Sequence, residues 1–303
     1  MHVNHTTLQT GERFAAGLPW KGLFAIVVWG ASFVATRIAL ECFSPFGLVA
    51  SRLLAGVLLL GVLVRLRGGA WSPARADWPR CVLLGVVLST HMVIQAYGLQ
   101  YTSAINTGWI IGFAPVTIAL GAHAVGQQRL TPMGWLGVLA GAGGVLFVTL
   151  RAPPDFSQAH FGDLLQVTSC VTWAVYTLAS TRLIARYGAL RTTAWAMGVA
   201  AVLVTLVATA QGVLSGPVTR PALIALAFLG VVCSGLAYSV WFSASYEHGP
   251  ARVAALLYLE PFVTLGAAAT ILAEPVTPNA VLGGLTVLAG VWLVARGARA
   301  PGV

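Results

Sequence analysis

Charged residues are scarce in this chain. Asp, Glu, Lys and Arg together make up 8% of its 303 residues, and Lys21 is its one lysine. A soluble globular domain is about 25% charged, whereas this chain is 58% hydrophobic and has a mean hydropathy of +0.85. Such a composition cannot cover a surface in contact with water, which excludes a soluble globular enzyme and a disordered scaffold.

Cysteine is also sparse, and no CxxC pair occurs. The four cysteines lie far apart and mostly inside apolar blocks, so we expect small buried hydrophobic residues rather than disulfides or a zinc site. The chain contains no HExxH motif, no P-loop and no paired acidic metal site. We therefore expect no cofactor, no metal and no enzymatic activity.

The few charges that are present are mostly positive, with a formal net charge of +9 and a pI near 10.0. A basic balance can mark a nucleic-acid-binding protein. Here the cations lie between apolar blocks and form no dense stripe, so we expect no nucleic-acid partner. Residues 1–19 are mixed polar and lack the roughly 7–15-residue apolar core of a signal peptide, which predicts a retained cytoplasmic N-terminal segment.

Long apolar blocks dominate the rest of the chain. A helix that crosses a bilayer needs about 20 mostly apolar residues, and short connections rich in Gly, Pro and Ser separate the blocks. The sequence thus predicts an all-α integral membrane protein with ten transmembrane helices in a lipid bilayer and a cytoplasmic tail over 297–303. The helices are expected at 20–40, 46–66, 79–99, 103–123, 132–150, 162–182, 190–210, 222–243, 251–272 and 279–296.

The distribution of Lys and Arg predicts the orientation. Thirteen of the 17 lie nearer the helix ends on the side of the N-terminus, and the other four are Arg37, Arg52, Arg151 and Arg220. Because cytoplasmic loops carry the excess of positive charge, both termini are expected in the cytoplasm. We expect the bacterial inner (plasma) membrane.

The chain also contains an internal repeat. Residues 146 positions apart match in the fourth and fifth helices and in the ninth and tenth: Pro115 with Pro261, Thr131-Pro132 with Thr277-Pro278, Gly137 with Gly283, and Gly144 with Gly290. This predicts two five-helix repeats, over 20–150 and 162–296. Since five is odd, fused halves must have opposite topology, the inverted-repeat plan of many secondary transporters, whose substrate site lies between the halves.

Four short motifs suggest a family. They are Trp29 to Phe33 (WGASF), Leu259-Glu260-Pro261, Ala273-Glu274 and Gly283 to Gly290. With these motifs the chain resembles, over about residues 20–296, the EamA family of the drug/metabolite transporter superfamily. The resemblance implies a ten-helix transporter built from two repeats, and the mix of aromatic and small polar residues is most similar to the family's amino-acid exporters. Gln128 departs from the usual Glu, and Ala114 stands where the ninth helix has Glu260.

Polar and aromatic residues recur at helical spacing on one face of helices 1, 3, 4, 6, 8 and 9. Polar groups at membrane depth avoid lipid, so these faces are expected to line one central cavity. The alternative is that Ser and Thr bond to their own helices and that the aromatic residues pack or lie at the membrane interface. The residues expected to bind substrate are Trp29, His91, Gln95, Trp109, Trp173, Tyr176, Tyr238, Trp241 and Glu260.

Two of these residues have alternative interpretations. His91 could bind a substrate carboxylate or amide, or could be a structural histidine bonded across helices. Glu260 could couple protons or anchor a substrate ammonium. It could also organise the turn that Pro261 breaks, since proline cannot donate to the carbonyl of Leu257. Pro115 and Pro261 are expected as matched kinks that flex during transport.

No Lys or Arg is expected at mid-span, because Arg37, Arg52 and Arg252 all fall near predicted helix ends. A carrier of sugar phosphates needs a cationic clamp, so we expect a neutral or zwitterionic amphipathic substrate. The predicted function is export of amino acids, aromatic and hydrophobic ones included, by alternating access. The alternatives are a lipophilic-cation exporter, a channel or scramblase, and an intramembrane enzyme using His91 and Glu260.

The fifth helix carries a glycine face, with Gly134, Gly137, Gly141 and Gly144 at spacings of 3, 4 and 3. Small residues at such spacing permit close helix packing in membranes. The partner is expected to be the tenth helix, through Gly283 and Gly290. A second protomer is the alternative, so monomer and dimer both stay open.

Overall fold

The computed structural model describes residues 19–68, 72–149, 158–248, 253 and 255–299. The predicted N-terminal segment, except for its last residue, and positions 300–303 of the tail lie outside these ranges. Arg151 and Arg252 lie outside them as well.

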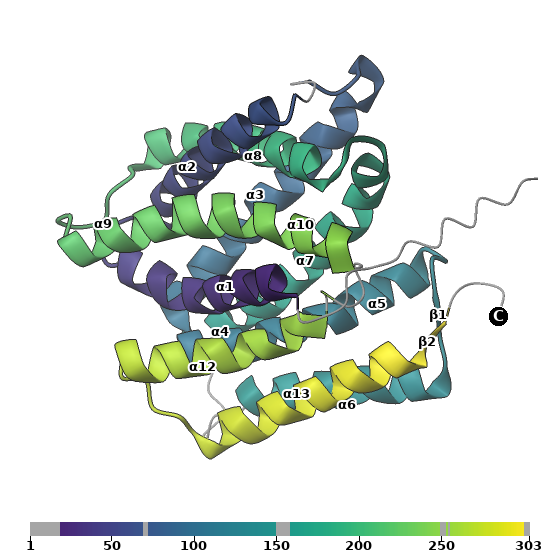
Figure 1. Ribbon diagram of the computed structural model, residues 1–303. Coiled ribbons are helices and arrows are strands. Elements are labelled where there is room, and N and C mark those ends of the chain that lie inside the picture. The colour runs from purple at the N-terminus through teal and green to yellow at the C-terminus, as the bar shows by residue number, and fades with distance from the viewer. Residues whose placement is uncertain (1–18, 69–71, 150–157, 249–252, 254, 300–303) are drawn as a thin grey trace, which may run out of the picture.

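The described residues are almost entirely helical (Figure 1). The first half contains α1 (Trp20–Ala39), α2 (Pro45–Leu66), the turn η1 (Arg75–Asp77), α3 (Trp78–Tyr101), α4 (Ala104–Ile111), α5 (Ala114–Ala124), β1 (Arg129–Leu130) and α6 (Pro132–Thr149). The second half contains α7 (Gln158–Tyr187), α8 (Ala189–Gln211), α9 (Arg220–Ala227), the π-helical η2 (Phe228–Ala237), α10 (Tyr238–His248), the 3₁₀ turn η3 (Ala255–Leu259), α12 (Glu260–Ile271), α13 (Pro278–Gly297) and β2 (Ala298–Arg299).

These elements form ten consecutive helical segments within the described ranges. The fourth combines α4 with α5, the eighth combines α9, η2 and α10, and the ninth combines η3 with α12. Eight helices are long and apolar enough to cross a membrane, and a shorter apolar helix covers Leu256–Ile271. The remaining segment, α7, has 30 residues, which is ample length for a span. The prediction of a ten-helix, all-α membrane protein is confirmed.

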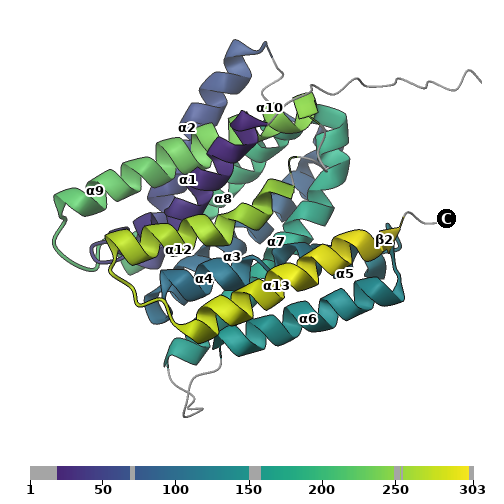
Figure 2. The same ribbon diagram turned by 60° about the horizontal axis from the view of Figure 1, so that its bottom comes forward.

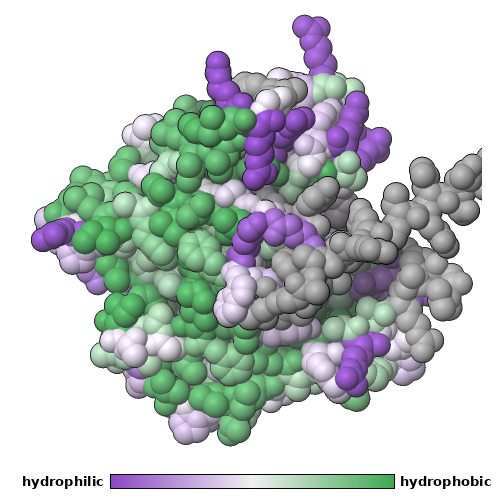
Figure 3. All heavy atoms as spheres, viewed as in Figure 1, coloured by the Kyte–Doolittle hydropathy of each residue, from purple (hydrophilic) through white to green (hydrophobic). Residues whose placement is uncertain are grey.

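The outer surface of the bundle is apolar, as lipid contact requires. Leu58, Leu139 and Leu206 are among the large hydrophobic side chains that it exposes, at 72%, 69% and 65%. Figure 3 shows hydrophobic residues spread over most of the visible face, with a few strongly hydrophilic ones, most of them near its edges. In a soluble monomer, contiguous apolar patches of this kind are rare.

Helices begin where the sequence supplies caps. The side chains of Ser44, Ser103, Thr219 and Thr277 each accept a hydrogen bond from a backbone amide of the first turn. Ser44 and Thr277 are followed by proline, which suits the first helical position because its missing N–H would have no partner there. These caps explain the boundaries of α2, α4, α9 and α13.

Contacts between the two halves come in matched pairs. Helix α2 packs against α8 and α6 against α13, and each pair joins a helix to its repeat counterpart. Helix α3 packs against α7, and α1 packs against α9, η2 and α10. Similarly, α1 packs against α12, and α7 against α4 and α5. The halves therefore interleave across a common interface, as an inverted duplication requires (Figures 1 and 2).

The α6–α13 pair is packed backbone to backbone. A Cβ atom added at Gly144 would lie 2.6 Å from the amide nitrogen of Val287 and 2.7 Å from the carbonyl oxygen of Gly283. One added at Gly137 would lie 2.6 Å from the carbonyl oxygen of Gly290. The strands β1 and β2 pair antiparallel at one end of this glycine seam. The predicted glycine face is thus occupied by the tenth helical segment of the same chain.

Candidate functional site

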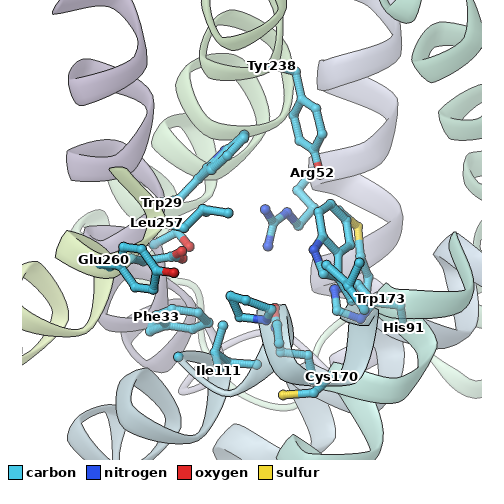
Figure 4. A pocket seen from close by; sticks show the side chains of 18 residues that line it. Trp29, Phe33, Arg52, His91, Ile111, Cys170, Trp173, Tyr238, Leu257 and Glu260 are labelled. Atoms are coloured by element: carbon cyan, nitrogen blue, oxygen red, sulfur yellow. The ribbon is translucent and has the colours of Figure 1, made fainter. Parts of the chain in front are cut away.

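A cavity opens between the two halves, near the mid-length of α1 and α3 (Figure 4). Its empty volume is about 890 Å³, a figure that includes open solvent at its mouth. Segments from all six helices expected to line it border the cavity, and α2 adds a seventh. The lining residues are Trp29, Ser32, Phe33, Arg52, His91, Met92, Gln95, Ile111, Gly112, Ala114, Pro115, Ile118, Cys170, Trp173, Tyr238, Leu257, Tyr258 and Glu260.

Two broken helices form part of the cavity wall. Helix α4 ends at Ile111 and α5 begins at Ala114, while η3 ends at Leu259 and α12 begins at Glu260. Pro115 and Pro261 lie in the first turns of α5 and α12, where proline is tolerated because no intrahelical partner for its N–H is needed. Both matched prolines therefore restart a helix. Interrupted helices at membrane depth are tolerated where they line a cavity.

Glu260 is placed by contacts between α12 and α1. The hydroxyl of Thr264 donates to the carbonyl of Gly30 (3.0 Å) and to the carbonyl of Glu260 (3.1 Å). A Cβ atom at Gly30 would lie 3.0 Å from the Glu260 carbonyl oxygen, so glycine permits this close approach. The carboxylate of Glu260 points into the cavity (Figure 4). Within the described residues it has no hydrogen-bond or ion-pair partner.

Aromatic rings make up two walls. Trp29 packs against Tyr238, with ring centroids 5.2 Å apart, and its indole N–H donates to the Cys233 carbonyl (3.4 Å). On the other wall, Trp173 lies 5.3 Å from the ring of His91. Such rings offer an apolar surface to a ligand.

His91 is bonded across helices. Its Nδ1 lies 3.0 Å from the carbonyl oxygen of Ser169 and 3.2 Å from Oγ1 of Thr172, both on α7. Because a carbonyl can only accept, Nδ1 must carry a proton in this arrangement. Nε2 has no hydrogen bond within the described part of the chain, although the residue is only 7% exposed. His91 is thus both structurally anchored and part of the cavity wall.

Arg52 was not expected in the cavity. Its side chain is 9% exposed, its Nε donates to Oγ of Ser234 (3.3 Å), and its guanidinium group reaches the cavity (Figure 4). A cationic group therefore does line the cavity, and the expectation that the cavity lacks one is wrong. Arg52 follows the first residue of α2 by seven positions, which places it about 10 Å along the helix at 1.5 Å per residue.

Three residues expected to bind substrate do not border the cavity. Trp109, only 1% exposed, packs edge-on against Phe262 and touches Gly284 of α13. Tyr176 stacks behind Trp173 at 5.5 Å, and Trp241 lies 5.2 Å from Trp29. Each shares a helical face with a lining residue, but the cavity is too narrow to reach them. The other six, Trp29, His91, Gln95, Trp173, Tyr238 and Glu260, are brought together there.

Polar contacts connect several helices at one end of the bundle, beyond the cavity. The Glu274 carboxylate accepts hydrogen bonds from the backbone amides of Ala104 and Ile105, each at 2.9 Å, and so caps the N-terminus of α4. Ala273 adopts a φ of 51° in the turn that positions Glu274. Arg37 donates to backbone carbonyls at the end of α3, one of them that of Thr102 (3.0 Å). The Glu274 contacts join the two halves on that side, and the Arg37 contacts join α1 to α3 within the first half.

A scan against protein families identifies the chain. The model of the EamA-like transporter family matches residues 20–150 and 160–296, nearly the whole chain in two copies. The chain belongs to the EamA-like transporter family. It is a multi-pass membrane transporter and not an enzyme.

Individual relatives of this EamA-like transporter are distant. An "Uncharacterized transporter" of Archaeoglobus fulgidus is 29% identical over 88% of this chain and 93% of its own. A "Probable terminal-alkyne amino-acid exporter" of Streptantibioticus cattleyicolor is 28% identical over 91% of this chain and 93% of its own. One crystal structure of a protein, 22% identical, superposes with a TM-score of 0.65 over 90% of this chain and 94% of that one, which shows the likeness of fold.

Proposed function

We propose that this EamA-like transporter is a secondary carrier that exports small amphipathic metabolites, above all amino acids with aromatic or hydrophobic side chains. The observation that supports this proposal is the cavity itself. It lies between the two repeats, two broken helices open onto it, and its walls combine indole and phenyl rings with a few polar groups. Ligand sites that recognise one polar end and one apolar end of a molecule have this composition.

We further propose how transport proceeds. Trp29, Trp173 and Tyr238 contact the apolar part of the substrate, His91, Gln95 and Glu260 supply polar contacts, and the breaks at Pro115 and Pro261 flex as access alternates. Inverted-repeat carriers change access by rocking one bundle against the other around a fixed site. The excess of Lys and Arg on one side supports cytoplasmic termini in a bacterial inner membrane. The amino-acid exporter among the relatives is consistent with the substrate class.

The test is counterflow in proteoliposomes. Vesicles are preloaded with unlabelled methionine or phenylalanine, and uptake of the labelled compound is followed at equal pH on both sides. We expect saturable exchange that empty liposomes lack. Exchange that does not saturate would indicate a channel or scramblase, and no exchange of any amino acid by folded protein would refute the proposal. Persistence without a pH gradient would show that exchange needs no proton gradient.

Two tryptophans on the same helix provide a matched pair of variants. Trp29→Ala removes a cavity wall, while Trp20→Ala removes a side chain that is 68% exposed at the start of α1. Apolar and aromatic contacts of this size contribute about 1–2 kcal/mol, which corresponds to about a 5- to 30-fold higher half-saturation concentration. Only Trp29→Ala should raise the half-saturation concentration in this way. Equal effects of the two variants would contradict the assignment of Trp29 to the site.

A lipophilic-cation exporter is the second candidate, because the carboxylate of Glu260, which has no partner among the residues that the structure describes, stands beside aromatic rings. Arg52 in the same cavity opposes it, since a like charge repels a cationic substrate. Competition of counterflow by a lipophilic quaternary ammonium compound, more strongly than by any amino acid, would favour this candidate.

A further inference from the structure

Two opposite formal charges face the same cavity. Arg52 enters from α2 and Glu260 from the start of α12, on facing sides of the space (Figure 4). They do not form an ion pair, and neither has another charged partner among the described residues. An arginine is charged at any physiological pH, and an unpaired charge at membrane depth is costly and marks a functional site. A ligand is therefore the expected source of an anionic partner for Arg52.

The position of Arg52 is built by tight packing of α2 against η2. A Cβ atom at Gly56 would lie 2.7 Å from Cβ of Ser234, and one at Gly230 would lie 2.6 Å from Cβ of Ala55. Ser234 lies on the π-helical segment and accepts the hydrogen bond from Nε of Arg52. This contact fixes the side chain through one nitrogen and leaves both terminal nitrogens for a ligand. Wide π-helical turns occur frequently at functional sites.

The chemistry of the two groups is complementary to one class of molecule. A guanidinium group binds a carboxylate through two parallel hydrogen bonds, and a carboxylate accepts hydrogen bonds from an ammonium group. Phe33 and Trp173 line the space beside the two charges. A molecule with a carboxylate, an ammonium and an apolar substituent on one carbon would satisfy both charges and the aromatic walls together.

We propose that Arg52 binds the α-carboxylate and Glu260 the α-ammonium of a zwitterionic amino acid, so that the cavity selects its substrates by these two groups. This inference rests on the proposed function as an amino-acid carrier and goes beyond it by naming the recognition elements. It follows that amino acids of varied apolar side chain are accepted. Molecules that lack either charged group are rejected.

The wild-type protein gives the first test, with analogues of one substrate. Counterflow of labelled phenylalanine is measured in competition with its methyl ester, with phenethylamine and with 3-phenylpropionate. These compounds lack the carboxylate charge, the carboxylate and the ammonium, respectively. Because a hydrogen bond to a charged group contributes enough to change affinity by about 10- to 100-fold, each should compete at least about tenfold more weakly than phenylalanine. Competition as strong as that of phenylalanine by the ester and the amine would overturn the proposal.

Variants assign each charge to its group. Arg52→Gln should lower the affinity for phenylalanine by about 10- to 100-fold and abolish the discrimination against the methyl ester. Glu260→Gln should abolish the discrimination against 3-phenylpropionate. Arg52→Lys keeps the charge but not the two parallel bonds, so an intermediate loss is expected. Arg65→Gln, at an exposed position near the end of α2, and Glu41→Gln, in an exposed turn, are the matched controls.

The outcomes separate this inference from the proposed function. If wild-type protein exchanges no amino acid, the proposed function fails. If it exchanges amino acids and Arg52→Gln still rejects the ester, the proposed function stands and the assignment of Arg52 is wrong. Thermal unfolding of each variant in detergent shows whether it is folded. Should Arg52→Gln not fold, Arg52→Lys and the analogue series on wild-type protein decide the question.

Discussion

Two neighbouring glycines of α6 should respond to the same substitution with opposite sign. Gly144 faces α13, where an added Cβ atom would meet backbone atoms of Val287 and Gly283 at 2.6 and 2.7 Å. Gly143 faces outward, and an added Cβ atom would meet nothing within 4 Å. The two positions share helix, depth and chemistry, and differ in what their side chain would touch. Gly144→Ala and Gly143→Ala are therefore matched variants.

The expected size of the effect follows from the seam. Ordinary contact begins at 3.4 Å, so α13 must move away from α6 by several tenths of an ångström, and its other close contacts along the seam loosen with it. Overpacking of this kind costs about 1–3 kcal/mol. At Gly143, alanine has no such cost and gains about 0.5–1 kcal/mol as a better helix former. The propensity gain applies equally at Gly144, so the two variants should differ by the overpacking cost, about 1–3 kcal/mol in the free energy of unfolding.

Labelling of the cysteine thiols provides the assay of unfolding. All four, Cys42, Cys81, Cys170 and Cys233, are free and buried, so a maleimide dye that fluoresces on reaction with thiols reports unfolding. For a chain of 303 residues, each kcal/mol shifts the apparent Tm by about 1.6 °C. Gly143→Ala should raise the Tm slightly, and Gly144→Ala should unfold about 2–5 °C below Gly143→Ala. Equal Tm values for the two variants would refute the close-packed seam.

Two further predictions concern contacts outside the cavity. Glu274→Gln removes the charge that caps α4 and leaves one oxygen where the amides of Ala104 and Ile105 now use two, so one amide loses its acceptor. Stability should therefore fall by about 1–2 kcal/mol in the same unfolding assay; Glu41→Gln, an exposed change at the same end, should not alter it. Trp109→Ala should destabilise by about 3–5 kcal/mol and leave the order of competing substrates unchanged, and an altered order in counterflow would show that Trp109 contacts substrate after all.

Much of the fold could be predicted because local sequence features determine where membrane helices begin and end. Apolar stretches of spanning length, Ser-Pro and Thr-Pro starts, and matched prolines are local features of the chain. The glycine spacing of α6 even indicated its partner, because α13 carries Gly283 and Gly290 at the corresponding places. Close packing without side chains leaves few other solutions for such a face.

The candidate site was harder to predict for two physical reasons. The first is depth, since Arg52 is near a helix end in sequence, yet seven residues of α2 carry it well inside the bundle. The second is how far the cavity extends sideways between the helices. Tyr176 and Trp241 lie one turn from Trp173 and Tyr238 on the same faces, and only the tertiary packing decides that they stand behind the wall. The π-helical turn at Ser234, which holds Arg52, had no distinct signal in the sequence.

The glycine seam has a further consequence. Gly137 is the repeat counterpart of Gly283, and Gly144 is that of Gly290, yet Gly137 contacts Gly290 and Gly144 contacts Gly283. Each glycine of α6 thus contacts the repeat counterpart of the other glycine of α6. In an isologous interface between two identical subunits, residue i of one subunit contacts residue j of the other and j contacts i, which is the same pattern. The surface that holds this single chain together therefore has the geometry of a homodimer contact. Gly137 and Gly283 therefore occupy equivalent positions on the two sides of one self-complementary interface.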